Sequence, residues 1–245
     1  MIDKSKVGRA LAGLAALMAL VPATAEAGSF SVNPVRLTLS AKESVGAITV
    51  TNQGAEPTVV QLETFSWSQH EGQDSLTPTN DVLATPPILT IPPGGSKIVR
   101  VGLRRPADPQ HELTYRLALR EIPPAEPLKQ ALRVTLLISM PIFIDPPRAV
   151  AAVVHWRATR APGNKIRLRV KNTGTAHIQM GQLEIVRADN GKPVATRNSA
   201  DYVLPDDTRE WLVDAPGPVA PGTLMRIRSV TDSGKASYET KLEEE

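Results

Sequence analysis

The sequence contains no cysteine, and tryptophan, tyrosine and phenylalanine occur only three times each among 245 residues. Without cysteine there is no disulfide, no thiol nucleophile and no thiolate metal ligand, so packing alone must hold the fold together. So few aromatic rings argue against a carbohydrate-binding platform. The basic residues are scattered, with no patch of interleaved cations and rings, so we do not expect nucleic acid as a partner.

The N-terminus has the pattern of a secretory signal peptide. Lys4, Lys6 and Arg9 precede an apolar run over residues 10–21, and Ala25-Glu26-Ala27 forms an A-x-A cleavage site. The apolar run is too short for a membrane-spanning helix. We therefore expect residues 1–27 to be removed and the mature chain to be exported.

After the leader, helical periodicity is absent and short alternating runs lie between Pro, Gly and Asn. The expected strands are 30–39, 46–52, 58–67, 88–91, 97–103, 112–120 and 132–144, followed by 150–157, 165–172, 181–188, 208–213, 223–230 and 236–242. Seven short strands with turn signals between them predict an immunoglobulin-like sandwich. The fold class is therefore all-β.

A local signature occurs once in each set of strands. Val50-Thr51-Asn52-Gln53-Gly54 in the first set matches Val170-Lys171-Asn172-Thr173-Gly174 in the second. Each is a strand running into a turn where Asn and Gly would tolerate positive φ. The match favours two similar domains, residues 28–146 and 147–245, joined where Pro146 and Pro147 stiffen the chain.

Patterns typical of catalysis are missing. His70, His111, His155 and His177 show no paired metal-ligand spacing, and neither a phosphate loop nor a G-x-S-x-G elbow occurs. The four histidines are expected to be ordinary surface or core residues. We expect neither an enzyme nor a metal or other cofactor.

The stretch LRVTLLISMPIFI, residues 132–144, is the most informative. Leu132, Val134, Leu136 and Ile138 share one apolar face at period two. Pro141 restricts the strand to an edge, yet no residue from Val134 to Met140 is of the kind that protects an edge from pairing. Either these side chains face their own core, or the edge is a working surface.

Several stretches together resemble the PapD-like periplasmic chaperones of the chaperone-usher pathway. They are Val35-Arg36-Leu37, residues 84–87 (ATPP), 91–95 (IPPGG), Val99-Arg100, residues 115–124 (YRLALREIPP) and the 132–144 edge, with a weaker match in the second half at Asn172-Thr173-Gly174 and Asp232-Ser233-Gly234. The resemblance implies two immunoglobulin-like domains in an L shape. It also implies binding of pilus subunits that lack a final strand, and delivery to an outer-membrane usher.

The resemblance further implies site residues. Leu132, Val134, Leu136 and Ile138 would be donor-strand residues that fill pockets of the subunit. Arg36 matches the first of two basic residues that bind the subunit's terminal carboxylate. The second is usually a lysine, and Pro141 stands at its position here, so Arg100 and Arg116 are candidates to replace it.

A second departure concerns the domain interface, which the family often joins through an acidic, basic and acidic trio. Glu112 and Asp232 match the two acids, but Asp145 stands where the arginine should be. Arg148 is the expected substitute. These departures indicate a divergent branch of the family.

The main functional prediction is an ATP-independent periplasmic chaperone for pilus or fimbrial biogenesis, with self-association through the free edge left open. The competing prediction is a secreted two-domain sandwich that binds a ligand or mediates adhesion. That alternative requires exposed rings, so Trp67, Trp156 or Trp211 would have to line a groove.

Overall fold

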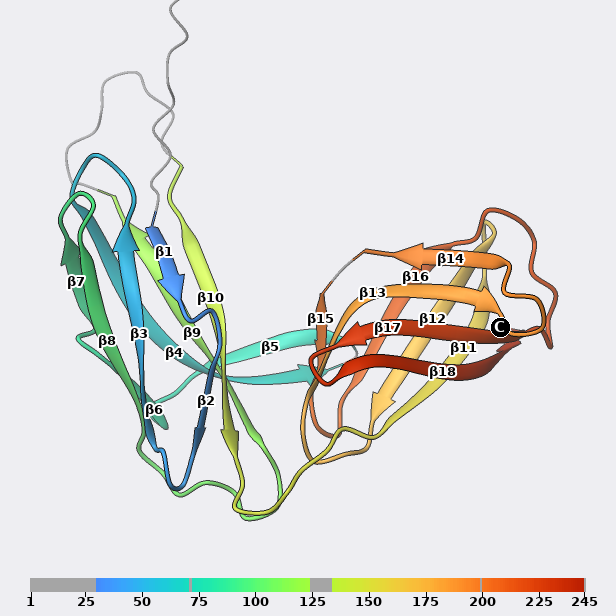
Figure 1. The fold of residues 1–245 in the computed structure, drawn as a ribbon, viewed down its shortest axis with the longest axis horizontal. Coiled ribbons are helices and arrows are strands. Elements are labelled where there is room, and N and C mark those ends of the chain that lie inside the picture. Colours follow the sequence, from blue (N-terminus) through green and yellow to red (C-terminus); the bar gives the residue numbers. More distant parts are fainter. Residues whose placement is uncertain (1–29, 71, 124–133, 199, 245) are drawn as a thin grey trace, which may run out of the picture.

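The computed structural model describes residues 30–70, 72–123, 134–198 and 200–244. These residues form strands and no helix, so none of the described segments is a helix that could cross a membrane. Figure 1 shows two β-sandwich bodies that meet at an angle, β1 to β10 in one and β11 to β18 in the other. The expected all-β fold with two immunoglobulin-like domains is confirmed.

The first domain consists of two sheets. One has the order β1-β3-β8-β6, with β1 Phe30–Asn33, β3 Val45–Asn52, β8 Ser96–Leu103 and β6 Val82–Thr85. The other has the order β2-β10-β9-β4-β5, with β2 Leu37–Ser40, β10 Leu137–Asp145, β9 Leu113–Ile122, β4 Thr58–His70 and β5 Gln73–Pro78, while β7, Ile88–Ile91, also pairs with β4.

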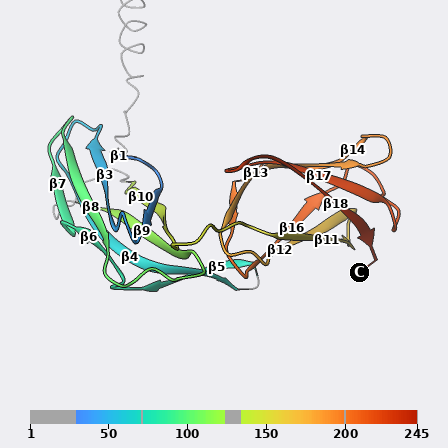
Figure 2. The same ribbon diagram turned by 60° about the horizontal axis from the view of Figure 1, so that its bottom comes forward.

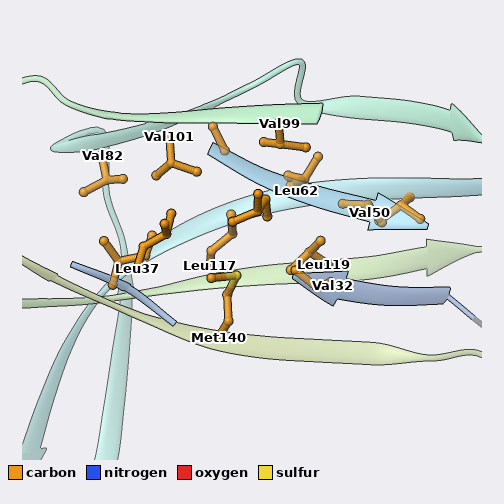
Figure 3. Packing of buried hydrophobic residues seen from close by; sticks show 14 of the residues in the cluster. Val32, Leu37, Val50, Leu62, Val82, Val99, Val101, Leu117, Leu119 and Met140 are labelled. Carbon is orange, nitrogen blue, oxygen red and sulfur yellow. The ribbon is translucent and has the colours of Figure 1, made fainter. Parts of the chain in front are cut away.

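The core of this domain lies between the two sheets. Alternate residues of facing strands supply it, as period-two patterning requires. Figure 3 shows Val50, Val99 and Val101 from one sheet directed toward Leu117 and Met140 from the other. Met140, Ile142 and Ile144 all belong to this core, so the even-numbered face of β10 points into the sandwich.

The predicted strand 30–39 is two strands in different sheets. Phe30 pairs with Asn52 in β3, whereas Leu37 pairs with Ile142 in β10. The chain crosses between sheets at Pro34, Val35 and Arg36, which are exposed. Because β2 begins only at Leu37, it covers only the second half of β10.

The second domain is a sandwich whose sheets join along one edge. Its order is β14-β13-β17-β18-β11-β12-β16, and β15 pairs with β13. The bounds are β11 Val154–Ala161, β12 Lys165–Asn172, β13 Ile178–Arg187, β14 Pro193–Arg197, β15 Asp201–Val203, β16 Thr208–Asp214, β17 Leu224–Thr231 and β18 Gly234–Glu243. The predicted strand 165–172 is confirmed, whereas 150–157 was placed too early, and β5, β6, β14 and β15 were not predicted.

The repeated Asn signature has the same hydrogen bonds in both domains. The Asn52 side-chain amide donates to Glu56 O and Ile91 O, and its Oδ1 accepts from the Gly54 N–H. Asn172 does the same with Ala176 O, Val203 O and the Gly174 N–H. Both asparagines are fully buried. The correspondence between the domains therefore extends to a buried polar network.

The conformational reason given for that signature was wrong. Neither the asparagines nor Gly54 and Gly174 have positive φ. Gly174 is constrained by a close approach, since a Cβ there would lie 2.2 Å from the Ala151 carbonyl oxygen. The asparagines serve as buried donors and acceptors that fix the turn.

Candidate functional site: a free strand edge beside the interdomain junction

The first half of β10 has a partner on one side only. It pairs antiparallel with β9 from Leu137 to Ile144, while β2 pairs with it only from Ile142 to Asp145. No described strand lies against Leu137 to Pro141 on the side away from β9. The sheet therefore has an unprotected edge of the kind that recruits an added strand.

The hydrogen-bond direction along β10 explains how Pro141 is tolerated. The Glu121 N–H donates to Leu136 O at 2.9 Å, so the backbone of Leu136 faces β9. Bonding direction alternates along an antiparallel pair, and the register has no bulge. The backbone groups of Leu137, Ser139 and Pro141 therefore point away from β9. The missing N–H of Pro141 interrupts no bond to β9.

The predicted donor residues differ in their surroundings. Leu132 lies outside the described residues. Val134 precedes the strand and is 57% exposed, whereas Leu136 and Ile138 are half-buried against the first domain's own core. The strand thus begins at Leu137, five residues later than predicted. Leu136 and Ile138 therefore cover the rim of the core, as the first expectation held, and the edge beside them is unpaired among the described strands.

The domains are joined beside the far half of β10. Glu112 from the first domain and Asp232 from the second both contact His177. Nδ1 of His177 lies 2.7 Å from Glu112 Oε1, and Nε2 lies 3.2 Å from Asp232 Oδ2, the latter as an ion pair rather than an aligned hydrogen bond. The His177 ring stacks on Phe143 of β10 at 3.6 Å between centroids.

This arrangement shifts several pKa values. Burial disfavours the imidazolium, but Asp232 and Glu112 outweigh burial and raise the pKa of His177 above 6.5. For Asp232, burial opposes ionisation, yet His177 outweighs it and lowers the pKa of the carboxyl. The pKa of Asp145 is raised by burial and by the nearby Glu112 charge. The junction therefore favours a cation between its acids.

The expected basic member of the trio is not the one the structure places there. His177 lies between Glu112 and Asp232, whereas Arg148 is exposed and forms no ion pair within the described part of the chain. Sequence reasoning passed over His177 because it is distant in sequence from both acids. The one available signal was the missing arginine, since the buried Glu112 carboxylate and the partly shielded Asp232 carboxylate, facing each other, require a cation.

Arg36 lies at the edge of this junction. Its Nη1 is 3.8 Å from Asp232 Oδ2, the same oxygen that faces His177, and its side chain is 42% exposed. Burial raises the pKa of Tyr202, and the charges of Arg36 and Arg116 partly offset that rise, which places both guanidiniums near one phenol. Arg36 is thus a cation only loosely held by its own chain.

Arg116 lies directly across the ladder from Pro141. Its guanidinium carbon is 3.7 Å from the centre of the buried Trp67 ring, and its Nη1 donates to Ser139 O at 3.3 Å. Burial lowers the pKa of Arg116, and no carboxylate of the described residues is within ion-pair distance. Arg100, the other candidate, faces outward from β8 in the opposite sheet, away from β10.

A second interdomain contact was not predicted. The β4–β5 hairpin extends from the first domain to the second (Figures 1 and 2). The buried Gln69 donates to Tyr202 O and accepts from the Leu204 N–H, each across the domain boundary. Asp74 beside it forms a 2.8 Å ion pair with Arg209. The hairpin went unpredicted because Gln73–Pro78 is polar and largely exposed.

No exposed aromatic platform is formed by the three tryptophans. Trp67 and Trp211 are buried, and Trp156 packs half-buried against Trp211 in the second domain's core. Among the described residues, no group of three or more His, Asp or Glu side chains could hold a metal ion. The candidate site thus consists of a free strand edge with the guanidinium groups of Arg36 and Arg116 beside it.

The fold and the junction define a two-domain immunoglobulin-like protein with an unpaired edge strand. Residues 29–149 match the family described as pili and flagellar-assembly chaperones, PapD N-terminal domain. The first domain of the chain therefore belongs to the PapD-like chaperones, and this match supports a chaperone role. The comparison with curated proteins gives no match.

Solved structures agree on the fold. The CsuC chaperone bound to the CsuE tip adhesion subunit of Acinetobacter baumannii archaic Csu pili has a TM-score of 0.64 at 19% identity, over 89% of this chain and 99% of that one. The Salmonella enterica SafB chaperone in complex with the SafA pilin gives 0.60 at 18%, over 88% and 97%. The Escherichia coli chaperone DraB gives 0.58 at 23%, over 91% and 99%.

Proposed function

We propose that this protein is a periplasmic chaperone that binds pilus subunits by lending them the free edge of β10. The observation that carries the proposal is the edge itself, where Leu137, Ser139 and Pro141 direct backbone groups to a side with no described strand. A subunit lacking its final strand would pair there and cover the apolar rim formed by Val134, Leu136 and Ile138. Leu132, which the structure does not describe, belongs to the same predicted set.

The second part of the proposal is an anion site made by Arg36 and Arg116. The family lysine is replaced by Pro141, and Arg116 supplies a cation from the position directly opposite on β9. Both guanidiniums lie near Tyr202. Among the described residues Arg116 has no carboxylate within ion-pair distance, and Arg36 has Asp232 at 3.8 Å. A terminal carboxylate arriving along β10 would thus meet two donors suited to it.

The remaining assignments complete the proposal. Residues 1–27 are a signal peptide cleaved on export to the periplasm, with domains over residues 28–146 and 147–245. After capture, the subunit passes to an outer-membrane usher. Completion of the subunit's own fold stabilises the complex, so no cofactor or nucleotide is required.

The test is affinity capture of the mature chain from the periplasm of its own cells. Val134→Asp places a charge on the exposed part of the donor face and should abolish recovery of a small β-rich subunit. Leu137→Asp is the matched control, because Leu137 is similarly exposed, at 51%, but lies on the opposite face. The control should still recover the subunit.

Capture is compared only if both variants unfold at the same temperature as the parent. Equal recovery by Val134→Asp and the parent would contradict the donor-face assignment. The competing proposal, a secreted adhesion or ligand-binding sandwich, predicts capture that neither variant changes.

A further inference from the structure

The His177 contacts have a feature that a permanent cation would lack. A neutral imidazole has one N–H and one lone pair, so it can donate through only one nitrogen. Here Nδ1 lies 2.7 Å from a Glu112 oxygen and Nε2 lies 3.2 Å from an Asp232 oxygen. Both contacts are attractive only when His177 carries a proton on each nitrogen. Loss of one proton leaves a lone pair facing a carboxylate.

We propose that His177 is a proton-dependent clasp between the two domains, and that through Asp232 it positions Arg36. The clasp joins Glu112, the residue just before β9, to Asp232 in the turn between β17 and β18. The part of the proposal that concerns Arg36 rests on the proposed function. The clasp itself does not.

The acids around His177 all act in one direction. Glu112 and Asp145 face it from the first domain and Asp232 from the second, while Tyr202 lies near its ring at 5.6 Å between centroids. Arg36, the cation beside this group, lies 3.8 Å from Asp232 Oδ2, the same oxygen that faces His177. Three acids thus surround one imidazole, and they favour its protonated form.

Deprotonation should break the weaker contact first. The Glu112 contact is shorter and is supported by the His177 backbone N–H, which also donates to Glu112 Oε1. The single remaining N–H should therefore stay on Nδ1, and Asp232 loses its partner at Nε2. The freed Oδ2 oxygen then has Arg36 as its nearest cation. The Glu112 contact, which crosses the domain boundary, changes from an ion pair to a weaker neutral hydrogen bond. Rising pH should therefore loosen the domain junction and draw Arg36 toward Asp232, away from an incoming carboxylate.

The absence of cysteine makes a direct test simple. Spin labels on Lys97→Cys and Lys241→Cys, one exposed site in each domain, report the interdomain distance by double electron–electron resonance. The distance distribution should be narrow at pH 5.5 and broad at pH 8.5. His177→Arg should keep it narrow at both pH values, His177→Asn should make it broad at both, and His155→Asn should behave as the parent. An identical distribution at both pH values in the parent would overturn the clasp.

Capture of the subunit tests the coupling to Arg36 separately. Recovery by the parent should fall between pH 6 and pH 8.5, whereas recovery by His177→Arg should not change. If the distances respond to pH but Arg36→Ala captures as well as the parent, the clasp stands and the anion site fails. If Arg36→Ala abolishes capture at every pH while the parent shows no pH dependence, the anion site stands and the coupling fails.

Discussion

The two halves of β10 have different roles although they form one continuous strand. From Ile142 to Asp145 the strand lies between β9 and β2, and Ile142, Phe143 and Ile144 are fully buried. From Leu137 to Pro141 β9 is its only partner among the described strands, and Leu137 and Ser139 are exposed. One half therefore builds the domain and the other leaves an unpaired edge.

The difference originates far away in the sequence, at the crossing between β1 and β2. If residues 30–39 formed one continuous strand beside β10, the whole edge would be covered. Because β1 pairs with β3 in the opposite sheet, β2 is short and protects only the buried half. A local break in one strand thus creates the free edge of another.

The largest predicted effect is on the buried half. Ile142→Ala removes a fully buried side chain and should lower the free energy of unfolding by about 2–5 kcal/mol. Val134→Ala, at an exposed residue before the free half of β10, should change the free energy of unfolding by no more than about 0.5 kcal/mol. Urea unfolding of both variants measures the contrast, and similar losses would show that the two halves are not distinct.

A smaller effect is expected at Arg116, which contacts Ser139 of the free half and the Trp67 ring that packs on Phe143 of the buried half. Arg116→Met keeps the packing on Trp67 but removes the cation, so it should cost about 0.5–2 kcal/mol of stability. Subunit capture should fall as it does in Arg36→Ala. Arg100→Met, a cation on the opposite sheet, is the control and should capture normally. Normal capture by Arg116→Met would remove it from the proposed anion site.

The pH dependence of stability should come from the buried half, where Phe143 supports His177. The pKa of His177 is raised in the folded state, so the stability it contributes is complete below about pH 6.5 and is lost as pH rises through the folded-state pKa. The unfolding temperature of the parent should decrease as pH rises through that range, and the unfolding temperature of His177→Arg should not. A parent as stable at pH 8.5 as at pH 6 would contradict the assignment.

The smallest effect on stability is expected at the free edge. Ser139→Pro removes an N–H that points away from β9. Pro141, two residues on, already lacks the equivalent N–H, so the free energy of unfolding should change by less than about 1 kcal/mol. Capture of the subunit should nevertheless be lost, because the free edge of β10 then offers one backbone hydrogen-bond donor fewer. Ser139→Ala should leave both properties unchanged. Capture by Ser139→Pro at the parent level would argue against backbone pairing.

Sequence patterns predicted the strands that alternate cleanly, such as 165–172, and the edge character that Pro141 implies. They missed the break in 30–39, although a signal exists: the buried apolar positions are even at Phe30 and Val32 but odd at Leu37 and Leu39. A change of phase within an alternating run marks a bulge or a crossing. Polar strands such as Gln73–Pro78 carry no apolar alternation and give no such signal.

The junction was predicted only in part. Glu112 and Asp232 were placed together by family resemblance, and the structure brings them to the same imidazole. His177 and the Gln69 contacts depend on how two domains pack, because their partners are more than 50 residues away in the sequence. Neither periodicity nor spacing contains that information. Strand register places Arg116, one of the two candidates, opposite Pro141, which is why we propose it rather than Arg100.

Hydrogen exchange of individual β10 amides tests the central claim most directly. In the free protein the amides of Leu137 and Ser139 should exchange rapidly, while those of Ile138 and Met140, which bond to β9, should be protected. With the captured subunit bound, Leu137 and Ser139 should become protected as well. If they are already protected in the dilute free protein, or stay unprotected in the complex, the first half of β10 is not the donated edge.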